Sequence, residues 1–232
     1  MAQTTYKDLL DAGTHFGHLT RKWDPKMAPY IFMEKNGIHI IDLNKTLVSL
    51  DYAATAIRNI AKSGRKVMFV ATKKQAQEIV TTEAERLKMP FVTDRWLGGM
   101  LTNFATVRKS LKKMATIDKM VKENTAYAAL AKREKLMMSR ERAKLDRVLG
   151  GIADLGRLPA ALFVVDVKRE HIAVKEAHKL GIPVFAMCDT NSNPELVQFP
   201  IPANDDASKS IQLIVGVIGK AIEDGLSERK VD

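Results

Sequence analysis

Apolar residues in the first quarter of the chain recur with two different spacings. Between residues 43 and 61 they return at every third or fourth position, which predicts one buried face of a helix that ends before Gly64. Before that helix, residues 30–33 and 38–41 form short apolar runs on either side of Asn36-Gly37. Because Asn-Gly is typical of a tight turn, these runs predict a β-hairpin.

From residue 67 onward, short apolar runs alternate with helical patterns. The runs lie at residues 67–71, 91–92, 162–165 and 184–187. Amphipathic spacing predicts helices over residues 76–87, in the stretch that ends at Gly181, and over residues 207–224. Apolar strands without alternation, interleaved with such helices, are typical of a parallel sheet covered on both faces. The pattern therefore predicts an α/β fold, doubly wound and Rossmann-like or flavodoxin-like, with a mainly parallel sheet.

Residues 104–149 interrupt this alternation with a long helical stretch. Apolar residues sit near heptad spacing in two arms, with a turn expected near Asn124-Thr125. This predicts an antiparallel α-helical, coiled-coil hairpin inserted into the α/β fold. The expected domains are an α/β globular domain from residues 1–103 and 150–232, which includes an N-terminal loop and β-hairpin at 14–42, and a basic helical hairpin at 104–149.

Most of the positive charge lies in the predicted hairpin. Residues 104–149 hold 13 Lys and Arg against five Asp and Glu, a net charge of +8 out of +10 for the whole chain. Such an excess favours a polyanionic partner such as nucleic acid. The alternative is a solvated helix face, because Lys and Arg are also good helix formers.

Features of membrane and secreted proteins are absent from the sequence. No run of about 18 apolar residues could span a bilayer, and the first residues lack the basic and apolar segments of a signal peptide. Cys188 is the only cysteine and has no internal disulfide partner. We therefore expect a soluble intracellular protein without a membrane partner.

Catalytic motifs are also missing. The chain contains neither of the glycine-rich phosphate loops, G-x-G-x-x-G or G-x-x-x-x-G-K-[ST]. Asp166 and Asp189 follow core strands, where α/β enzymes place their sites, but aspartates there more often cap helices or turns. His15 and His18 are weak metal candidates, since Cys188 is the only thiol that could join them. We expect no enzyme activity, no cofactor and no small-molecule substrate, with an α/β enzyme and a protein-only adaptor as the alternatives.

Cations interleave with aromatic residues at several places outside the hairpin. The candidate RNA-binding residues are Arg21, Lys22, Trp23 and Lys26, then Lys73 and Lys74 after the first core strand, then Arg95 and Trp96 at the start of the hairpin. Lys and Arg can contact phosphates while aromatic rings stack on bases. The alternative is that the aromatic residues anchor loops to the core and the lysines mark an exposed helix start.

An ordered set of motifs resembles the ribosomal protein S2 family of the bacterial small subunit. The motifs are DAGTHFGH at 11–18, KWDPKM at 22–27, NGIHIIDL at 36–43, TKKQA at 72–76, RWLGGMLTN at 95–103, PAALFVVD at 159–166, EHIAVKEA at 170–177, DTN at 189–191 and IPANDDA at 201–207. Their order and their spread over nearly the whole chain make the resemblance specific.

The resemblance implies a cytoplasmic, ribosomal protein of translation with a Rossmann-like domain and a protruding hairpin. It implies binding to small-subunit rRNA between head and body, late in assembly. It also implies ribosomal proteins S3, S5 and S8 as neighbours, and a role in docking ribosomal protein S1, which recruits mRNA. We extend rRNA contact to the eight residues above and, in the hairpin, to Arg108, Lys109, Lys112 and Lys113. Asp24 departs from the Asn common in the family, and a carboxylate there disfavours direct phosphate contact.

Overall fold

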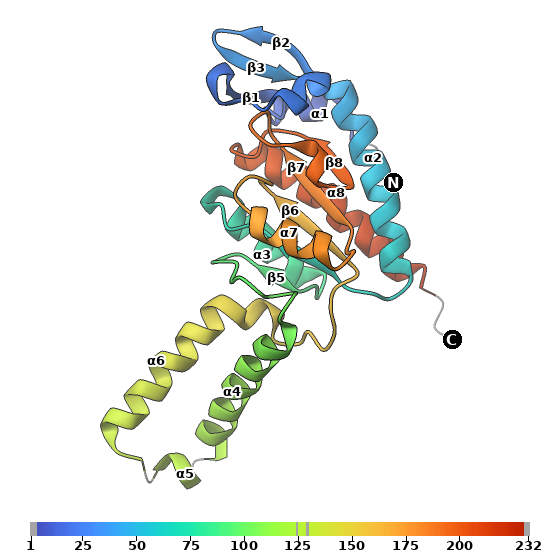
Figure 1. Cartoon of the computed structure of the whole chain (residues 1–232). Helices are drawn as coiled ribbons and strands as arrows, with labels where there is room; N and C mark the ends of the chain where they lie inside the picture. Colours follow the sequence, from blue (N-terminus) through green and yellow to red (C-terminus); the bar gives the residue numbers. More distant parts are fainter. Residues whose placement is uncertain (1–3, 124, 129, 230–232) are drawn as a thin grey trace.

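Five strands form a parallel sheet in the computed structural model, which describes residues 4–123, 125–128 and 130–229. In chain order the strands are β4 (Val67–Val70), β5 (Phe91–Val92), β6 (Ala161–Val165), β7 (Val184–Cys188) and β8 (Phe199–Pro202), and across the sheet they run β5-β4-β6-β7-β8. This is the flavodoxin-like order, and the direction of winding reverses between β4 and β6 (Figure 1). The predicted parallel α/β sheet is confirmed.

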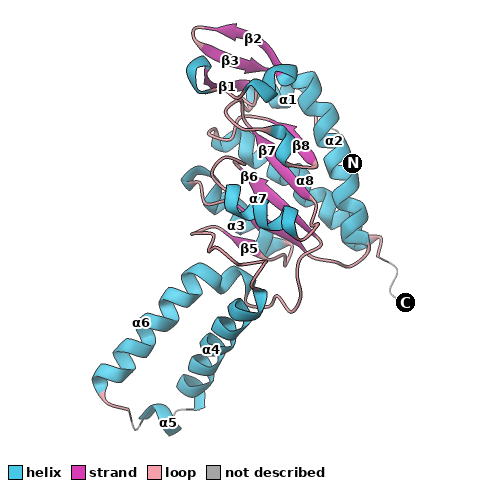
Figure 2. Ribbon diagram, viewed as in Figure 1, coloured by secondary structure: helices cyan, strands magenta, loops and turns pink. Residues whose placement is uncertain are grey.

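Helices cover both faces of this sheet (Figure 2). The helices α2 (Leu43–Lys62), α3 (Lys74–Arg86) and α8 (Ser208–Ser227) enclose one apolar cluster, which includes Phe69, Phe163 and Phe185 from the strands. The opposite face, which includes Met68 and Val164, packs against α7 (His171–Lys179). Successive side chains along each strand alternate between these two cores, which explains why the strands are apolar throughout.

The N-terminal part forms a second, antiparallel sheet. Helix α1 (Tyr6–Asp11) precedes strands β1 (Phe16–Leu19), β2 (Ile31–Lys35) and β3 (Ile38–Ile41), which pair in the order β1-β3-β2. The turn of the hairpin has φ of +53° at Asn36 and +73° at Gly37, so the predicted hairpin is confirmed. The expected loop is not wholly irregular, since it holds β1 and two 3-10 helices, η1 (Thr20–Lys22) and η2 (Pro25–Tyr30).

Strand β8 is absent from the sequence prediction because its residues include Pro200 and Pro202. Proline lacks the N–H that a central strand needs, so strands with two prolines are found mainly at sheet edges. The structure agrees with this rule, since β8 pairs only with β7 and ends the sheet.

Two long helices leave the sheet at the end opposite to the N-terminal sheet (Figure 1). They are α4 (Phe104–Glu123) and α6 (Lys132–Leu149), with the short α5 (Thr125–Ala128) between them and the short η3 (Gly150–Ile152) after α6. Arg142 of α6 bonds Asp118 of α4 at 2.9 Å. Leu111, Met114 and Ile117 are buried on α4, whereas Met137 on α6 is 61% exposed.

A continuous coiled-coil seam and the division into two domains stay predictions. Of the turn expected near Asn124-Thr125, Asn124 lies outside the described residues and Thr125 is the first residue of the short α5. Among the described residues, no helix combines the length and the apolar character that a membrane crossing needs.

Candidate nucleic-acid interface

The four predicted cations of α4 share one side of the helix. Arg108, Lys109, Lys112 and Lys113 are all exposed, and 108/112 and 109/113 are pairs four residues apart. Residues with that spacing stack along the helix surface, and these four lie on the side of α4 that faces away from its buried stripe of Leu111, Met114 and Ile117. Lys113 makes an ion pair with Glu141 of α6. Among the described residues, Arg108, Lys109 and Lys112 form no ion pair, so their charge faces solvent.

A second exposed group lies beside the N-terminal sheet. Arg21 and Lys22 are exposed in η1, and the ring of Trp23 is 39% exposed with its centroid 5.1 Å from that of His39. Lys26 is also exposed and pairs with Glu195 at 2.9 Å. One face of Trp23 therefore packs on the protein, and the ring keeps enough exposure to contact a base or sugar.

Asp24 is a capping residue in this loop. Its Oδ1 accepts a hydrogen bond from the amide of Lys26 at 2.9 Å, and its own amide donates to the carbonyl of Thr190 at 2.8 Å. The carboxylate thus begins η2, which is a role that Asn could fill equally well. The hydrogen bonds of Asp24 therefore explain its place in the loop without a phosphate contact.

The two exposed cationic groups lie at opposite ends of the molecule (Figure 1). Two further exposed cations lie between these ends: Lys74, the first residue of α3, and Arg95, in the loop after β5. The sequence-predicted residues therefore do not form a single patch. They form one group at each end, with isolated cations between them.

Trp96 and Lys73 have internal partners. Trp96 is only 6% exposed, and its Nε1 donates to Glu176 Oε1 at 3.2 Å. Lys73 is buried, and its Nζ lies 2.5 Å from Asp205 Oδ1 and 2.6 Å from Asp206 Oδ1. Burial acts to lower the pKa of Lys73, but the neighbouring carboxylates outweigh it and raise that pKa. These two side chains offer less surface to RNA than the other ten candidates.

The residues most able to hold a metal ion surround Lys73. Ligand atoms of His18, Asp189, Asp205 and Asp206 all lie within 4.8 Å of one another. His18 Nδ1 is 2.9 Å from Asp189 Oδ2, and its Nε2 is 3.4 Å from Asp206 Oδ2. One imidazole and three carboxylates suit Zn²⁺ or Mn²⁺. We call these four residues the His-Asp cluster.

Burial and charge repulsion both act on Asp205 in the His-Asp cluster. Burial and the nearby carboxylates of Asp189 and Asp166 together raise the pKa of Asp205 to about 7, although Lys73 opposes them. Oδ2 of Asp205 is buried and has no hydrogen-bond partner among the described residues. A hydrogen bond from His18 to Asp189 raises the pKa of the imidazole. A divalent cation would neutralise this excess of negative charge.

Two members of the His-Asp cluster were candidates from the sequence: His18 as a weak metal ligand, and Asp189, together with Asp166, as a carboxylate at the end of a core strand. His15, the other metal candidate, is not part of the cluster, and burial lowers its pKa. Asp189 follows β7 and Asp205 follows β8, so both lie at the carboxyl edge of the parallel sheet. Because β8 was not predicted, nothing in the sequence pattern placed Asp205 beside Asp189.

Asp166 and Cys188, the two other residues considered for catalysis, have structural surroundings. Asp166 Oδ1 accepts from the amide of Arg169 at 3.0 Å, which is a capping contact. Cys188 is fully buried, and burial raises the pKa of its thiol, so it is a poor nucleophile.

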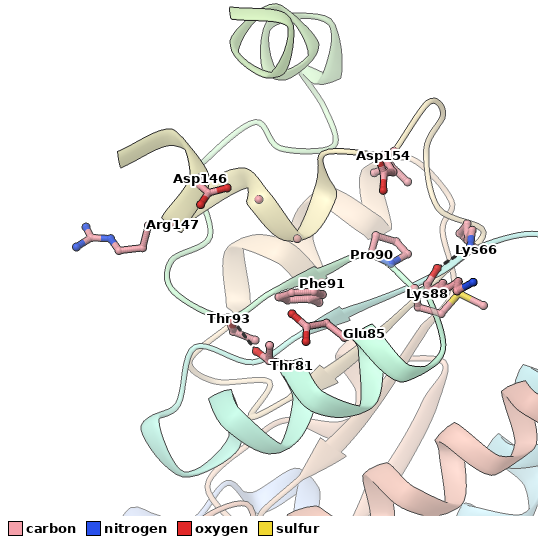
Figure 3. Close-up of a pocket in the computed structure, with 14 residues that line it drawn as sticks. Lys66, Thr81, Glu85, Lys88, Pro90, Phe91, Thr93, Asp146, Arg147 and Asp154 are labelled. Carbon is pink, nitrogen blue, oxygen red and sulfur yellow. Dashed lines mark hydrogen bonds between the residues drawn. The ribbon is translucent and has the colours of Figure 1, made fainter. Parts of the chain in front are cut away.

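A cavity of about 740 Å³ lies where β4 and β5 begin (Figure 3). Lys66, Glu85, Phe91, Arg147 and Asp154 are among the residues that line it. Open α/β sheets bind ligands at the carboxyl ends of their strands, and this cavity is at the other edge. Its position therefore gives no support to an enzyme site.

Comparison with known proteins gives matches over nearly the whole chain. The profile described as Ribosomal protein S2 matches residues 9–225. The small ribosomal subunit protein uS2 of Cytophaga hutchinsonii is 73% identical over 225 residues, which are 97% of this chain and 88% of that protein. The proteins of the same name from Parabacteroides distasonis and Flavobacterium psychrophilum are 61% and 62% identical, over 100% and 97% of this chain and 83% and 85% of theirs.

Proposed function

The chain belongs to the ribosomal protein S2 family, and we propose that it binds small-subunit rRNA through the exposed cations of α4 and of the N-terminal loop. As a member of that family it is a structural constituent of the small ribosomal subunit. The comparisons therefore support the expected role as a structural constituent of the small subunit. We propose that the protein acts on the ribosome, in the cytoplasm.

One observation carries the proposal for RNA contact. Arg108, Lys109 and Lys112 project from a helix that leaves the body of the protein, and no carboxylate among the described residues pairs with them. Cations that are not neutralised within the protein can replace the counterions of a nucleic acid backbone, and release of those counterions drives binding. A solvated helix face needs no such clustering of one sign of charge.

The separation of the two cationic groups supports a bridging position on the subunit. Arg21 and Lys22 lie at one end and the cations of α4 at the other, so one copy could touch two segments of rRNA. We propose that these segments belong to the head and the body, and that the protein joins late in assembly, when both are folded. The family resemblance supports this placement.

Ribosomal proteins S3, S5 and S8 are the proposed protein neighbours, with S1 docked through this chain for mRNA recruitment. Phe32 and Met33 on the edge strand β2 are 70% and 47% exposed. Exposed apolar side chains beside one another are a common feature of protein contacts. They support a protein partner at the N-terminal sheet, whereas the identity of each neighbour rests on the family resemblance.

Charge reversal on α4 tests the RNA proposal. A tagged copy with Lys109→Glu, Lys112→Glu and Lys113→Glu should comigrate less with small subunits in a density gradient. A control with Lys179→Glu, Lys209→Glu and Lys220→Glu carries the same change in net charge on other exposed positions and should comigrate like the wild type. Full incorporation of the α4 variant at ordinary salt would remove α4 from the RNA contact. Pulldown of proteins that survives nuclease treatment would instead favour a protein-only adaptor.

A further inference from the structure

One buried carboxylate on α7 organises the loop that leads into α4. Glu176 accepts five hydrogen bonds from that loop. Its Oε1 accepts from Trp96 Nε1 at 3.2 Å and from the Gly99 amide at 2.6 Å. Its Oε2 accepts from the Leu101 amide at 3.0 Å, the Thr102 amide at 3.0 Å and Thr102 Oγ1 at 3.1 Å. No cation among the described residues pairs with Glu176, so N–H and O–H dipoles alone balance its charge.

The loop has the form of an anion-binding nest. Three backbone amides of a short segment, those of residues 99, 101 and 102, converge on a single negative group, as amides do around phosphates. Gly99 has φ of +91°, a left-handed conformation in which a side chain would be strained. Glycine at this position therefore lets these three amides turn toward Glu176.

The carboxylate is held in its charged form by this loop. Burial by itself would raise the pKa of Glu176, but hydrogen bonds from the amides of Thr102, Gly99 and Leu101 and from Trp96 outweigh burial and lower that pKa. Hydrogen bonds to a charged acceptor are stronger than those between neutral groups. The loop and the carboxylate therefore stabilise each other.

Asn103 connects this nest directly to α4, which begins at the next residue. The amide of Asn103 donates to the carbonyl of Gly99 at 2.8 Å, and Asn103 Oδ1 accepts from Thr106 Oγ1 at 2.9 Å. The carbonyl of Asn103 accepts from the amide of Thr106 at 3.1 Å. Any change in the 99–102 backbone is therefore passed to the first turn of α4.

We propose that Glu176 is a positioning residue for rRNA binding: its carboxylate fixes the 96–102 loop and thereby sets the direction in which α4 presents its cations. This inference rests on the proposed contact between α4 and rRNA. The residue touches no RNA itself and acts through the loop.

Glu176→Gln tests this role, with Glu170→Gln as the matched control. Gln has nearly the shape of Glu but replaces one acceptor oxygen with an NH₂ group that faces backbone donors. Glu170 is another buried carboxylate beside α7, and it bonds the amide of Thr72 at 2.9 Å instead of the 96–102 loop. Both variants change a buried carboxylate, and only one touches the nest.

Two readouts separate positioning from general stability. Hydrogen exchange at the amides of Gly99, Leu101 and Thr102 should be faster by about tenfold or more in Glu176→Gln, because each amide loses its charged acceptor: one oxygen is replaced by NH₂ and the other becomes neutral. A photoreactive side chain at position 112 should cross-link less to rRNA in subunits that carry Glu176→Gln, while one at position 22 should keep its yield. Glu176→Asp, which keeps the charge, should restore part of the cross-linking at position 112.

Each outcome decides between the alternatives. Unchanged hydrogen exchange at the three amides would overturn the positioning role. So would an equal loss of cross-linking at positions 112 and 22 that Glu170→Gln also produces. Absence of cross-linking from position 112 in the wild type would contradict the proposed contact between α4 and rRNA. That result is distinguishable from a failure of the positioning role, which is seen only when Glu176 is changed. If Glu176→Gln does not fold, wild-type NMR still decides, since the amide shifts of Gly99 and Thr102 should titrate with a pKa below that of an ordinary Glu. Amides that do not follow such a titration would overturn the proposal.

Discussion

Lys73 Nζ lies 2.5 Å from Asp205 Oδ1, and this buried ion pair joins the carboxyl ends of β4 and β8 across the sheet. Asp166, at the end of β6, has an oxygen 3.6 Å from the same nitrogen. Lys73 therefore sits at the point where three strands end. The lysine that the sequence presented as a phosphate contact is also a centre of charge balance within the protein.

Removal of the Lys73 ammonium should strongly destabilise the fold. Lys73→Met keeps much of the side chain's volume but leaves the carboxylates of Asp205, Asp206 and Asp166 without their cation. Loss of one partner of a buried ion pair costs about 3–5 kcal/mol. We expect a lower midpoint in urea unfolding, whereas Lys74→Met, which changes the exposed neighbour, should leave it nearly unchanged. Equal midpoints for both variants would contradict this role.

The stability of the chain should decrease as the pH rises from about 4 to about 7. The pKa of Asp205 is raised to about 7 in the folded protein, so the folded state binds more protons than the unfolded state over that interval. The raised pKa of His18 adds a contribution in the same direction, which is lost as the pH rises through its folded value. Urea midpoints at a series of pH values measure this. Asp205→Asn should flatten the profile, and an identical profile in that variant would exclude Asp205 as its source.

The sequence predicted elements whose pattern reflects burial, and it did not predict the contacts that depend on chain topology. The periodic apolar face of α2 and the Asn36-Gly37 turn are local features, and both are present as expected. Strand β8 was missed because Pro200 and Pro202 resemble loop residues, although the sheet edge tolerates them.

The candidate site depends even more on topology. The exposure of Arg108 and Lys109 follows from helical periodicity, so it could be foreseen. The burial of Lys73 could not, since its partner Asp205 is 132 residues away along the chain. Trp96 was equally unpredictable, because its hydrogen bond depends on how α7 packs beside the 96–102 loop.

A divalent cation should bind the His-Asp cluster and stabilise the protein. Zn²⁺ and Mn²⁺ accept imidazole and carboxylate ligands, and a bound ion would offset the repulsion that raises the pKa of Asp205. Titration calorimetry with each ion should show binding with release of protons, and the melting temperature should rise. His18→Ala and Asp189→Asn should lose both effects, while His15→Ala should keep them. Equal binding to the His18 and His15 variants would refute the assignment of ligands.

Removal of single cations on α4 should change how RNA binding depends on salt. The logarithm of affinity falls linearly with the logarithm of salt concentration, with a slope that reflects the number of phosphates neutralised. Arg108→Ala, Lys109→Ala and Lys112→Ala should each reduce that slope by about one when small-subunit rRNA is titrated at several salt concentrations. Lys113→Ala should have a smaller effect, because its ammonium is already paired with Glu141. A slope that none of the four changes would mean that α4 does not meet the phosphate backbone. The contact would then have to come from the exposed candidate cations outside α4, which are Arg21, Lys22, Lys26, Lys74 and Arg95.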